Sequence, residues 1–149
     1  MIIAGTLALC VASVAVVAPG AGAATHASTS QRIVTVAKKY VGHARYRYGG
    51  SSPKHGFDCS GFTKYVYKKA HVAKLPHNAE RQRDMHRVEH VSKKHRKVGD
   101  LVFYMSGGDA YHVAIYAGHN KTYSATDPRQ GITHKKIHGK HIRYGRLKS

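Results

Sequence analysis

The spacing of apolar residues changes once along this chain, and this change limits the folds that the chain can adopt. Before residue 97, apolar side chains recur at the three- and four-residue spacing of helices. After Lys97-Val98-Gly99 they form short runs separated by turn-forming residues, a pattern typical of strands. Helices followed by strands predict the α+β fold class, with N-terminal helices packed on a meandering antiparallel sheet.

Three helices are predicted in the first part of the chain. The first covers residues 31–41, with Ser30 as its N-cap and Gly42 at its end. The second begins at Cys59 and continues to about residue 70, and a short third helix covers residues 78–86. Residues 43–57 contain glycine, serine and proline at turn spacing, so they predict a loop.

About five strands are predicted in the second part of the chain. They cover residues 100–104, 112–117, 121–126, 132–137 and 141–147. No internal repeat is visible, and the length suits one domain with one core.

The N-terminal segment predicts an exported protein. Residues 2–18 are almost wholly apolar, and a run of small residues at 21–24 suits signal-peptide cleavage. We therefore expect a signal peptide at 1–24, a polar linker at 25–30 and one domain at 31–149. No Lys or Arg precedes the apolar run, which leaves a retained membrane anchor as the alternative.

The charge of the chain indicates an anionic partner. Lys and Arg number 25 against seven acidic residues, for a formal net charge of +18. For an exported protein, such a field favours anionic wall polymers as partners. Simple solubility is the alternative explanation. Specific nucleic-acid binding is not expected, since no nucleic-acid motif organises the basic residues.

Cys59 is the only cysteine outside the apolar N-terminal segment, which holds Cys10. It cannot form an internal disulfide there, so it is a dimer bridge, a buried spectator or a nucleophile. Its position at the start of a predicted helix favours the nucleophile, because a helix N-terminus lowers the pKa of a thiol. A reactive thiol is a poor dimer bridge, so we expect a monomer.

A nucleophilic thiol needs a base, and histidine is the usual one. The chain has thirteen histidines, and His112 differs from the others because it begins an apolar predicted strand after a glycine turn. At a strand mouth its ring can face a cleft. A histidine that merely caps the strand is the alternative.

Four segments in series carry a family resemblance. They are Tyr48-Gly49-Gly50, Phe57-Asp58-Cys59-Ser60-Gly61-Phe62, Gly99-Asp100-Leu101-Val102-Phe103-Tyr104 and His112-Val113-Ala114-Ile115-Tyr116. In order and spacing they resemble the signatures of the NlpC family of papain-like bacterial cell-wall cysteine peptidases. The resemblance runs from about residue 31 to 147 and implies a papain-like fold.

The resemblance also implies roles for individual residues. Cys59 matches the nucleophile and His112 matches the general base. Tyr48 matches a tyrosine beside the thiol that can donate to an oxyanion, and Asp58 matches an acidic residue that lines the substrate site. Ser60 completes this oxyanion and substrate-binding set, although in the first helical turn it also suits a structural role. Tyr48 as a packed aromatic and Asp58 as a helix N-cap are the structural alternatives.

The third catalytic position departs from the family pattern. Family members usually carry a polar residue there, most often histidine, which orients the base. Counting from His112 without gaps, this chain has Ser124 at that position. A serine oxygen can accept a hydrogen bond from the imidazole. Asp127 and His119 are the alternatives if the turns fold back.

A second motif points to another chemistry. Residues 86–90 spell H-x-x-E-H, the inverted zinc-peptidase pattern. On a helix, His86 and His90 would share one face and Glu89 could activate water. In a chain so rich in histidine the match is weak, and the stretch is as readily extended as helical. We therefore expect neither a metal nor another cofactor.

Together these features predict a secreted, single-domain cysteine peptidase of the bacterial envelope. The resemblance implies peptidoglycan stem peptides as the substrate, with the bond between D-glutamate and the diamino acid as the expected target. The alternative is a non-catalytic, strongly basic wall-binding protein on the same fold, with Ser124 as a sign of lost catalysis.

Overall fold

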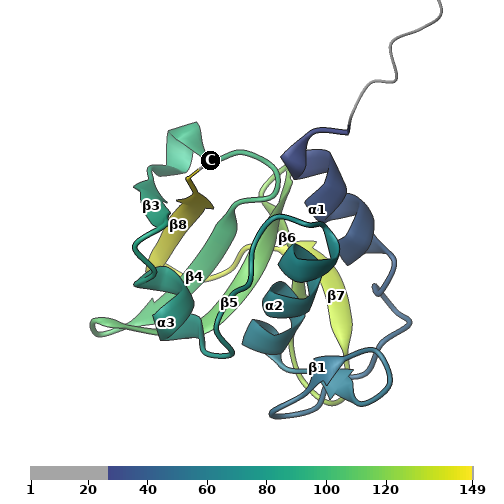
Figure 1. The fold of residues 1–149 in the computed structure, drawn as a ribbon. Helices are drawn as coiled ribbons and strands as arrows, with labels where there is room; N and C mark the ends of the chain where they lie inside the picture. The colour runs from purple at the N-terminus through teal and green to yellow at the C-terminus, as the bar shows by residue number, and fades with distance from the viewer. Residues whose placement is uncertain (1–26, 149) are drawn as a thin grey trace, which may run out of the picture.

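The helices form where the apolar spacing predicts them, with shifted ends. The computed structural model describes residues 27–148 (Figure 1). It contains α1 (Thr29–Lys38), α2 (Cys59–Lys69), α3 (Ala79–Arg83) and a 3-10 turn, η1 (Lys93–His95). The predicted signal peptide lies outside the described residues.

Two predicted helix ends are wrong, for local reasons. Ser28, not Ser30, caps α1, because its side chain accepts a hydrogen bond from the Gln31 backbone N–H. The helix thus begins inside the predicted linker. The third helix ends at Arg83 instead of residue 86, because the chain turns there toward a strand.

The main sheet has six antiparallel strands rather than the expected five. Their order is β3-β8-β4-β5-β6-β7. The bounds are β3 (Val88–Val91), β4 (Leu101–Ser106), β5 (Asp109–Gly118), β6 (Lys121–Ala125), β7 (Ile132–Lys136) and β8 (Ile142–Leu147). The α+β fold class is confirmed, and β3 is the strand that the sequence pattern did not reveal.

The predicted meander is only partly right. Strands β4 to β7 follow one another as expected, but β8 returns across the sheet to pair with β4, and β3 pairs with β8 at the edge. This return depends on residues distant in sequence, such as Leu101 opposite Gly145. Periodicity within a segment carries no such information.

A small hairpin interrupts the predicted loop before α2. β1 (Ser51–Ser52) pairs with β2 (Gly56–Phe57), and Phe57 is fully buried beneath it. The hairpin thus joins the core directly to Asp58 and Cys59, the next two residues of the chain.

The core lies between the helices and one face of the sheet, with the three helices on the same side (Figure 1). Fully buried side chains from each layer meet there, among them Ala37, Phe62, Val66, Leu101 and Ile115. Along β4 and β5 the residues between these face a second, smaller cluster with Val102 and Ala114. Within residues 27–148, no helix is long and apolar enough to cross a membrane.

Candidate active site

The first turn of α2 carries the cysteine. Asp58 is the N-cap, and its Oδ1 accepts a 2.7 Å hydrogen bond from the Gly61 backbone N–H. Gly61 is required here, because an added Cβ would lie 1.9 Å from the Gly50 carbonyl oxygen. The close approach holds the hairpin segment against the turn that begins with Cys59.

Cys59 and His112 face one cleft. The thiol is free and half-buried, and the cleft measures about 440 Å³. It also receives Tyr46, Asp58 and Ser60. The structure therefore brings the predicted nucleophile, the predicted base and all three predicted substrate-binding residues, Tyr48 included, to one place.

The environment of the thiol differs from the sequence-based expectation. Burial raises the pKa of Cys59, and the negative charge of Asp58 raises it further. Hydrogen bonds from the backbone N–H groups of Val113, Ser60 and Cys59 itself act in the opposite direction. Burial outweighs the helix N-terminus, so the expected lowering of the pKa is wrong, and the resting group is a thiol.

His112 lies inside β5, opposite Tyr104 of β4, and not at a strand mouth as predicted. Its Nε2 is 2.7 Å from Ser124 Oγ on β6. When Nε2–H donates to Ser124, the other ring nitrogen carries the free lone pair that a base needs. The Tyr104 ring meets the imidazole edge-on, with centroids 5.1 Å apart. Ser124 thus reaches the base, as the ungapped count predicted.

Burial also decides the charge of the base. It lowers the pKa of His112 to about 4, so the imidazole is neutral at pH 7. Cys59 and His112 line the same cleft. At neutral pH they rest as thiol and neutral imidazole.

The alternatives for the third position are engaged elsewhere. Asp127 accepts hydrogen bonds from the backbone of Arg129 and from both backbone and side chain of Gln130 within its own turn. His119 is exposed in the turn between β5 and β6.

Tyr48 lines the cleft, but its side chain is 89% exposed. The chain turns there, with the Gly50 N–H bonded to the Arg47 carbonyl oxygen and Gly49 at a φ of +73°. Tyr48 therefore borders the cleft while most of its surface stays exposed. Tyr46 is half-buried instead. Burial raises its pKa, and the negative charge that Cys59 can carry raises it further. Tyr46 and Cys59 line the same cleft.

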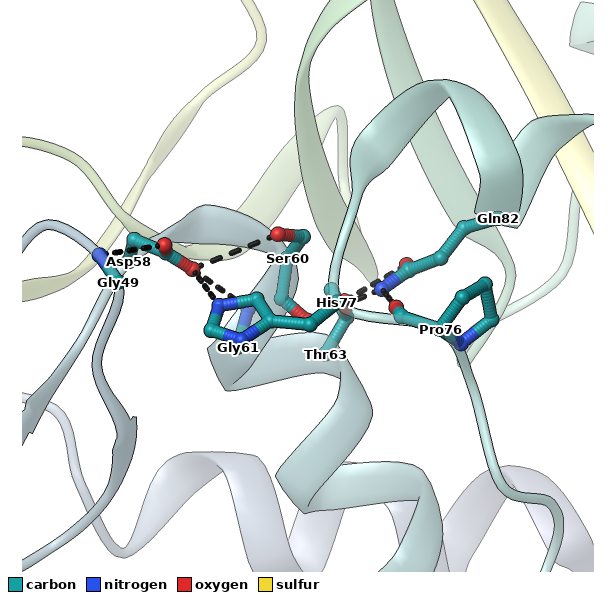
Figure 2. Close-up of polar contacts among 8 residues, drawn as sticks. All are labelled: Gly49, Asp58, Ser60, Gly61, Thr63, Pro76, His77 and Gln82. Atoms are coloured by element: carbon teal, nitrogen blue, oxygen red, sulfur yellow. Dashed lines mark hydrogen bonds and ion pairs between the residues drawn. The ribbon is translucent and has the colours of Figure 1, made fainter.

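Asp58 is the centre of a polar network (Figure 2). Its Oδ2 accepts from the Gly49 backbone N–H at 2.9 Å. Its Oδ1 accepts from Gly61, from His77 Nε2 at 2.7 Å and from the Ser60 hydroxyl at 3.4 Å. Asp58 is thus an N-cap as well as a cleft residue, and the two alternatives weighed from sequence coexist.

Gln82 of α3 extends the network beneath the same turn (Figure 2). The side chain is fully buried, and its Nε2 donates to the carbonyl oxygens of Ser60 and Pro76 at 3.0 and 2.8 Å. Its Oε1 accepts from the Thr63 hydroxyl at 2.8 Å. These three hydrogen bonds use both the amide nitrogen and the amide oxygen of Gln82. They fix α3 against the first turn of α2, at the residue after Cys59.

Sequence reasoning missed Tyr46, His77 and Gln82. Tyr46 stands two residues before Tyr48, and only the intervening turn separates their environments. Gln82 is one of several polar residues in the short helix α3, and the sequence pattern does not show that it is the buried one. Nothing in the local pattern marked His77 as a partner of Asp58.

The zinc-type motif does not form the arrangement that it requires. Glu89 and His90 lie in strand β3, and His86 precedes that strand. The two histidines therefore do not share one face of a helix. Among residues 27–148 no group of three or more His, Cys, Asp or Glu side chains could hold a metal ion.

The fold and the site together define a papain-like domain with a cysteine at the start of a helix and a histidine on the sheet. A family model, NlpC/P60 family, matches residues 42–147. The chain belongs to the NlpC/P60 family, and the resemblance drawn from its motifs is confirmed.

Similar proteins agree with this assignment. "Probable endopeptidase p60" of Listeria monocytogenes is 39% identical over 107 residues, which are 72% of this chain and 21% of that protein. "Gamma-DL-glutamyl hydrolase" of Bacillus subtilis is 37% identical over 106 residues, 70% of this chain and 25% of that protein. This chain thus matches only about a fifth to a quarter of the length of these relatives.

A solved structure agrees with the architecture. The NlpC/p60 domain of the peptidoglycan hydrolase SagA has a TM-score of 0.68 and 31% identity, covering 80% of this chain and 98% of that domain. The match is to almost the whole of that isolated domain.

Proposed function

We propose that this protein is a secreted cysteine peptidase that hydrolyses amide bonds in peptidoglycan stem peptides, with Cys59 as the nucleophile and His112 as the base. The observation that carries the proposal is the 2.7 Å contact between His112 Nε2 and Ser124 Oγ. It leaves the second ring nitrogen to accept the proton of the thiol in the same cleft.

The proposed reaction has two halves. As the sulfur of Cys59 attacks the carbonyl carbon, His112 takes the thiol proton and the carbonyl oxygen becomes an oxyanion. Collapse of this intermediate breaks the C–N bond, and the leaving amine takes the proton from His112. Water, deprotonated by His112, then attacks the thioester, and the carboxylate leaves as the thiol is restored.

The oxyanion needs donors in the cleft. The backbone N–H of Cys59 lies at the start of α2, where no earlier helical carbonyl uses it. We assign the second donor to the hydroxyl of Tyr46 in place of the predicted Tyr48, because Tyr46 is the half-buried phenol beside the thiol. Asp58 and Ser60 remain as cleft residues beside the substrate.

The substrate class comes from the relatives. The similar proteins are named as endopeptidases and hydrolases, and one name specifies a γ-DL-glutamyl bond. We therefore retain the bond between D-glutamate and the diamino acid as the target. Export by the N-terminal segment and a monomeric state are further parts of the proposal.

Mass spectrometry of muropeptides tests this function. The purified protein is incubated with cell walls beside its Cys59→Ala variant, and the expected result is a set of product masses that require Cys59. The masses identify the bond. Products from both proteins would reject Cys59 as the nucleophile.

The alternative is a non-catalytic, strongly basic wall-binding protein. Two observations favour it: serine at the third catalytic position and a thiol whose pKa is raised by burial. Under this alternative, folded protein yields no products from several wall types but still co-sediments with them.

A further inference from the structure

A cluster of lysines lies on the outer side of α2 and on the loop that follows it. Lys64, Lys68, Lys69 and Lys74 line one open groove of about 760 Å³. Of the described residues that line this groove, none is acidic. We call it the α2 groove.

The lysines are placed at some cost to α2. Lys64 and Lys68 stand four residues apart, so their ammonium groups repel each other along one side of the helix. Within residues 27–148, the four ion pairs formed by acidic side chains involve other partners. The helix dipole favours Lys68 and Lys69 in the last turn but gives no reason for Lys64 or Lys74. An anionic ligand would relieve this repulsion.

The one aromatic ring in the groove is already occupied. The ammonium group of Lys69 lies 5.8 Å from the centre of the Tyr65 ring, and the Tyr65 hydroxyl bonds to that of Tyr40 at 2.9 Å. The ring is therefore fixed and partly covered. Proteins that bind single-stranded nucleic acids stack bases on free aromatic faces, and this groove offers none.

The cations of the groove are of one kind. Arginine, whose planar fork suits carboxylates, is absent from the described lining, and the charged groups are lysines beside His71. Lysine ammonium groups act as point charges and bind phosphate without a demand for bidentate geometry. A row of them suits a chain of singly charged phosphodiesters.

We propose that the α2 groove binds a phosphodiester polymer without bases, of the poly(glycerol phosphate) type. This site is separate from the cleft of Cys59 and holds the protein on an anionic wall polymer. The binding goes beyond the proposed hydrolysis, and it can be measured with the Cys59→Ala protein.

A second basic groove provides a matched control. Lys93, Lys140 and Arg143 line an open groove of about 580 Å³ with His90 and His141. It has a similar number of cations, but Arg143 is one of them, and its lysines come from the 3-10 turn η1 and from the loop before β8, whereas three of the four lysines of the α2 groove come from one helix. Replacing three cations in either groove removes the same formal charge.

The test uses the full chain and fluorescent poly(glycerol phosphate), with binding followed by anisotropy over a range of salt. Two triple variants are compared: Lys64→Gln, Lys68→Gln, Lys74→Gln, and Lys93→Gln, Lys140→Gln, Arg143→Gln. The α2-groove variant is expected to bind about tenfold more weakly, with a salt slope lower by about two to three. The control variant is expected to lose less than about threefold.

Three results would overturn the proposal. Equal losses in the two variants would mean that the net charge, and not the α2 groove, binds the polymer. Tighter binding to single-stranded DNA, or to vesicles of phosphatidylglycerol, would identify a different ligand.

Circular dichroism checks that both variants fold. If a triple variant does not fold, the single Lys64→Gln and Lys93→Gln variants are compared instead. Hydrolysis of soluble muropeptides is expected to stay unchanged in both, so a failure of catalysis is separable from a failure of binding.

Discussion

The catalytic pair and the helical turn beside it hold their polar groups in opposite ways. The ring of His112 has one side-chain hydrogen bond, to Ser124, and within residues 27–148 no side chain forms a hydrogen bond with the Cys59 thiol. Asp58, by contrast, accepts four hydrogen bonds, and Gln82 makes three more below it. The two groups proposed to exchange a proton, Cys59 and His112, have few hydrogen bonds. The side chains that hold the adjoining turn, Asp58 and Gln82, have several each.

The largest effect expected from this comparison is at the base. His112→Ala is predicted to lower kcat/KM for muropeptide hydrolysis by about 10²–10⁴-fold, because it removes the ring nitrogen that is proposed to take the thiol proton. His138→Ala, at an exposed histidine, is the matched control and should leave the rate unchanged. A similar loss in both variants would mean that His112 is not the base.

The proposed nucleophile and base were assigned from local signals together with the family resemblance. A helix pattern that starts at Cys59 and an apolar strand pattern around His112 are both visible in windows of a few residues. Ser124 followed from the family pattern, because an ungapped count from His112 to the third catalytic position ends there. The fold class was predictable for the same reason, since each helix and most strands carry their own periodicity.

The supporting turn was not predictable, because its contacts join distant segments. His77 and Gln82 meet Asp58 and Ser60 from 19 and 22 residues away. The same limit applies to β8, which crosses the sheet to pair with β4. The choice between Tyr46 and Tyr48 was not predictable for a local reason. Both tyrosines fit the pattern and line the cleft, and only the turn after Tyr46 leaves one half-buried and the other exposed.

The second prediction concerns pH. Burial lowers the pKa of His112 to about 4, and only the neutral ring accepts a proton. Hydrolysis of muropeptides should therefore persist in acid and fall through about pH 4 instead of 6.5.

The state of the thiol can be measured in the same protein. Burial raises the pKa of Cys59, so iodoacetamide should alkylate it more slowly at pH 7 in native than in urea-unfolded protein. Peptide mapping by mass spectrometry reads Cys59 separately from Cys10. Rapid alkylation of the native thiol at pH 7 would show a preformed thiolate instead.

The third prediction addresses the fully bonded region. Gln82→Leu leaves the carbonyl oxygens of Ser60 and Pro76 and the Thr63 hydroxyl without this partner in a buried site. The free energy of unfolding should fall by about 1–3 kcal/mol, measured by urea denaturation. Gln130→Leu, at an exposed turn, is the control. Unchanged stability in Gln82→Leu would mean that water or a shifted α3 replaces the network.

The fourth prediction addresses the single bond of the base. Ser124→Ala removes the group that orients His112, and kcat should fall by about two- to tenfold, in line with a net hydrogen bond of about 0.5–1.5 kcal/mol. Ser124→His is expected to keep or raise activity, because an imidazole can also accept from Nε2–H. A folded but inactive Ser124→His protein would mean that Ser124 is not the orienting residue.

The smallest effect is expected where the two regions meet, at His77. The His77 side chain is 26% exposed, and Asp58 keeps its bonds to Gly49 and Gly61 when the imidazole is removed. His77→Ala should therefore lower the free energy of unfolding by less than about 1 kcal/mol and leave kcat nearly unchanged. His55→Ala is the matched control, since it loses one comparable contact, to Ser52, in the exposed hairpin. A loss of kcat/KM in His77→Ala without a loss of stability would show that His77 acts through Asp58 on the substrate. Asp58 and His77 would then belong to the reactive region as well as to the supporting turn.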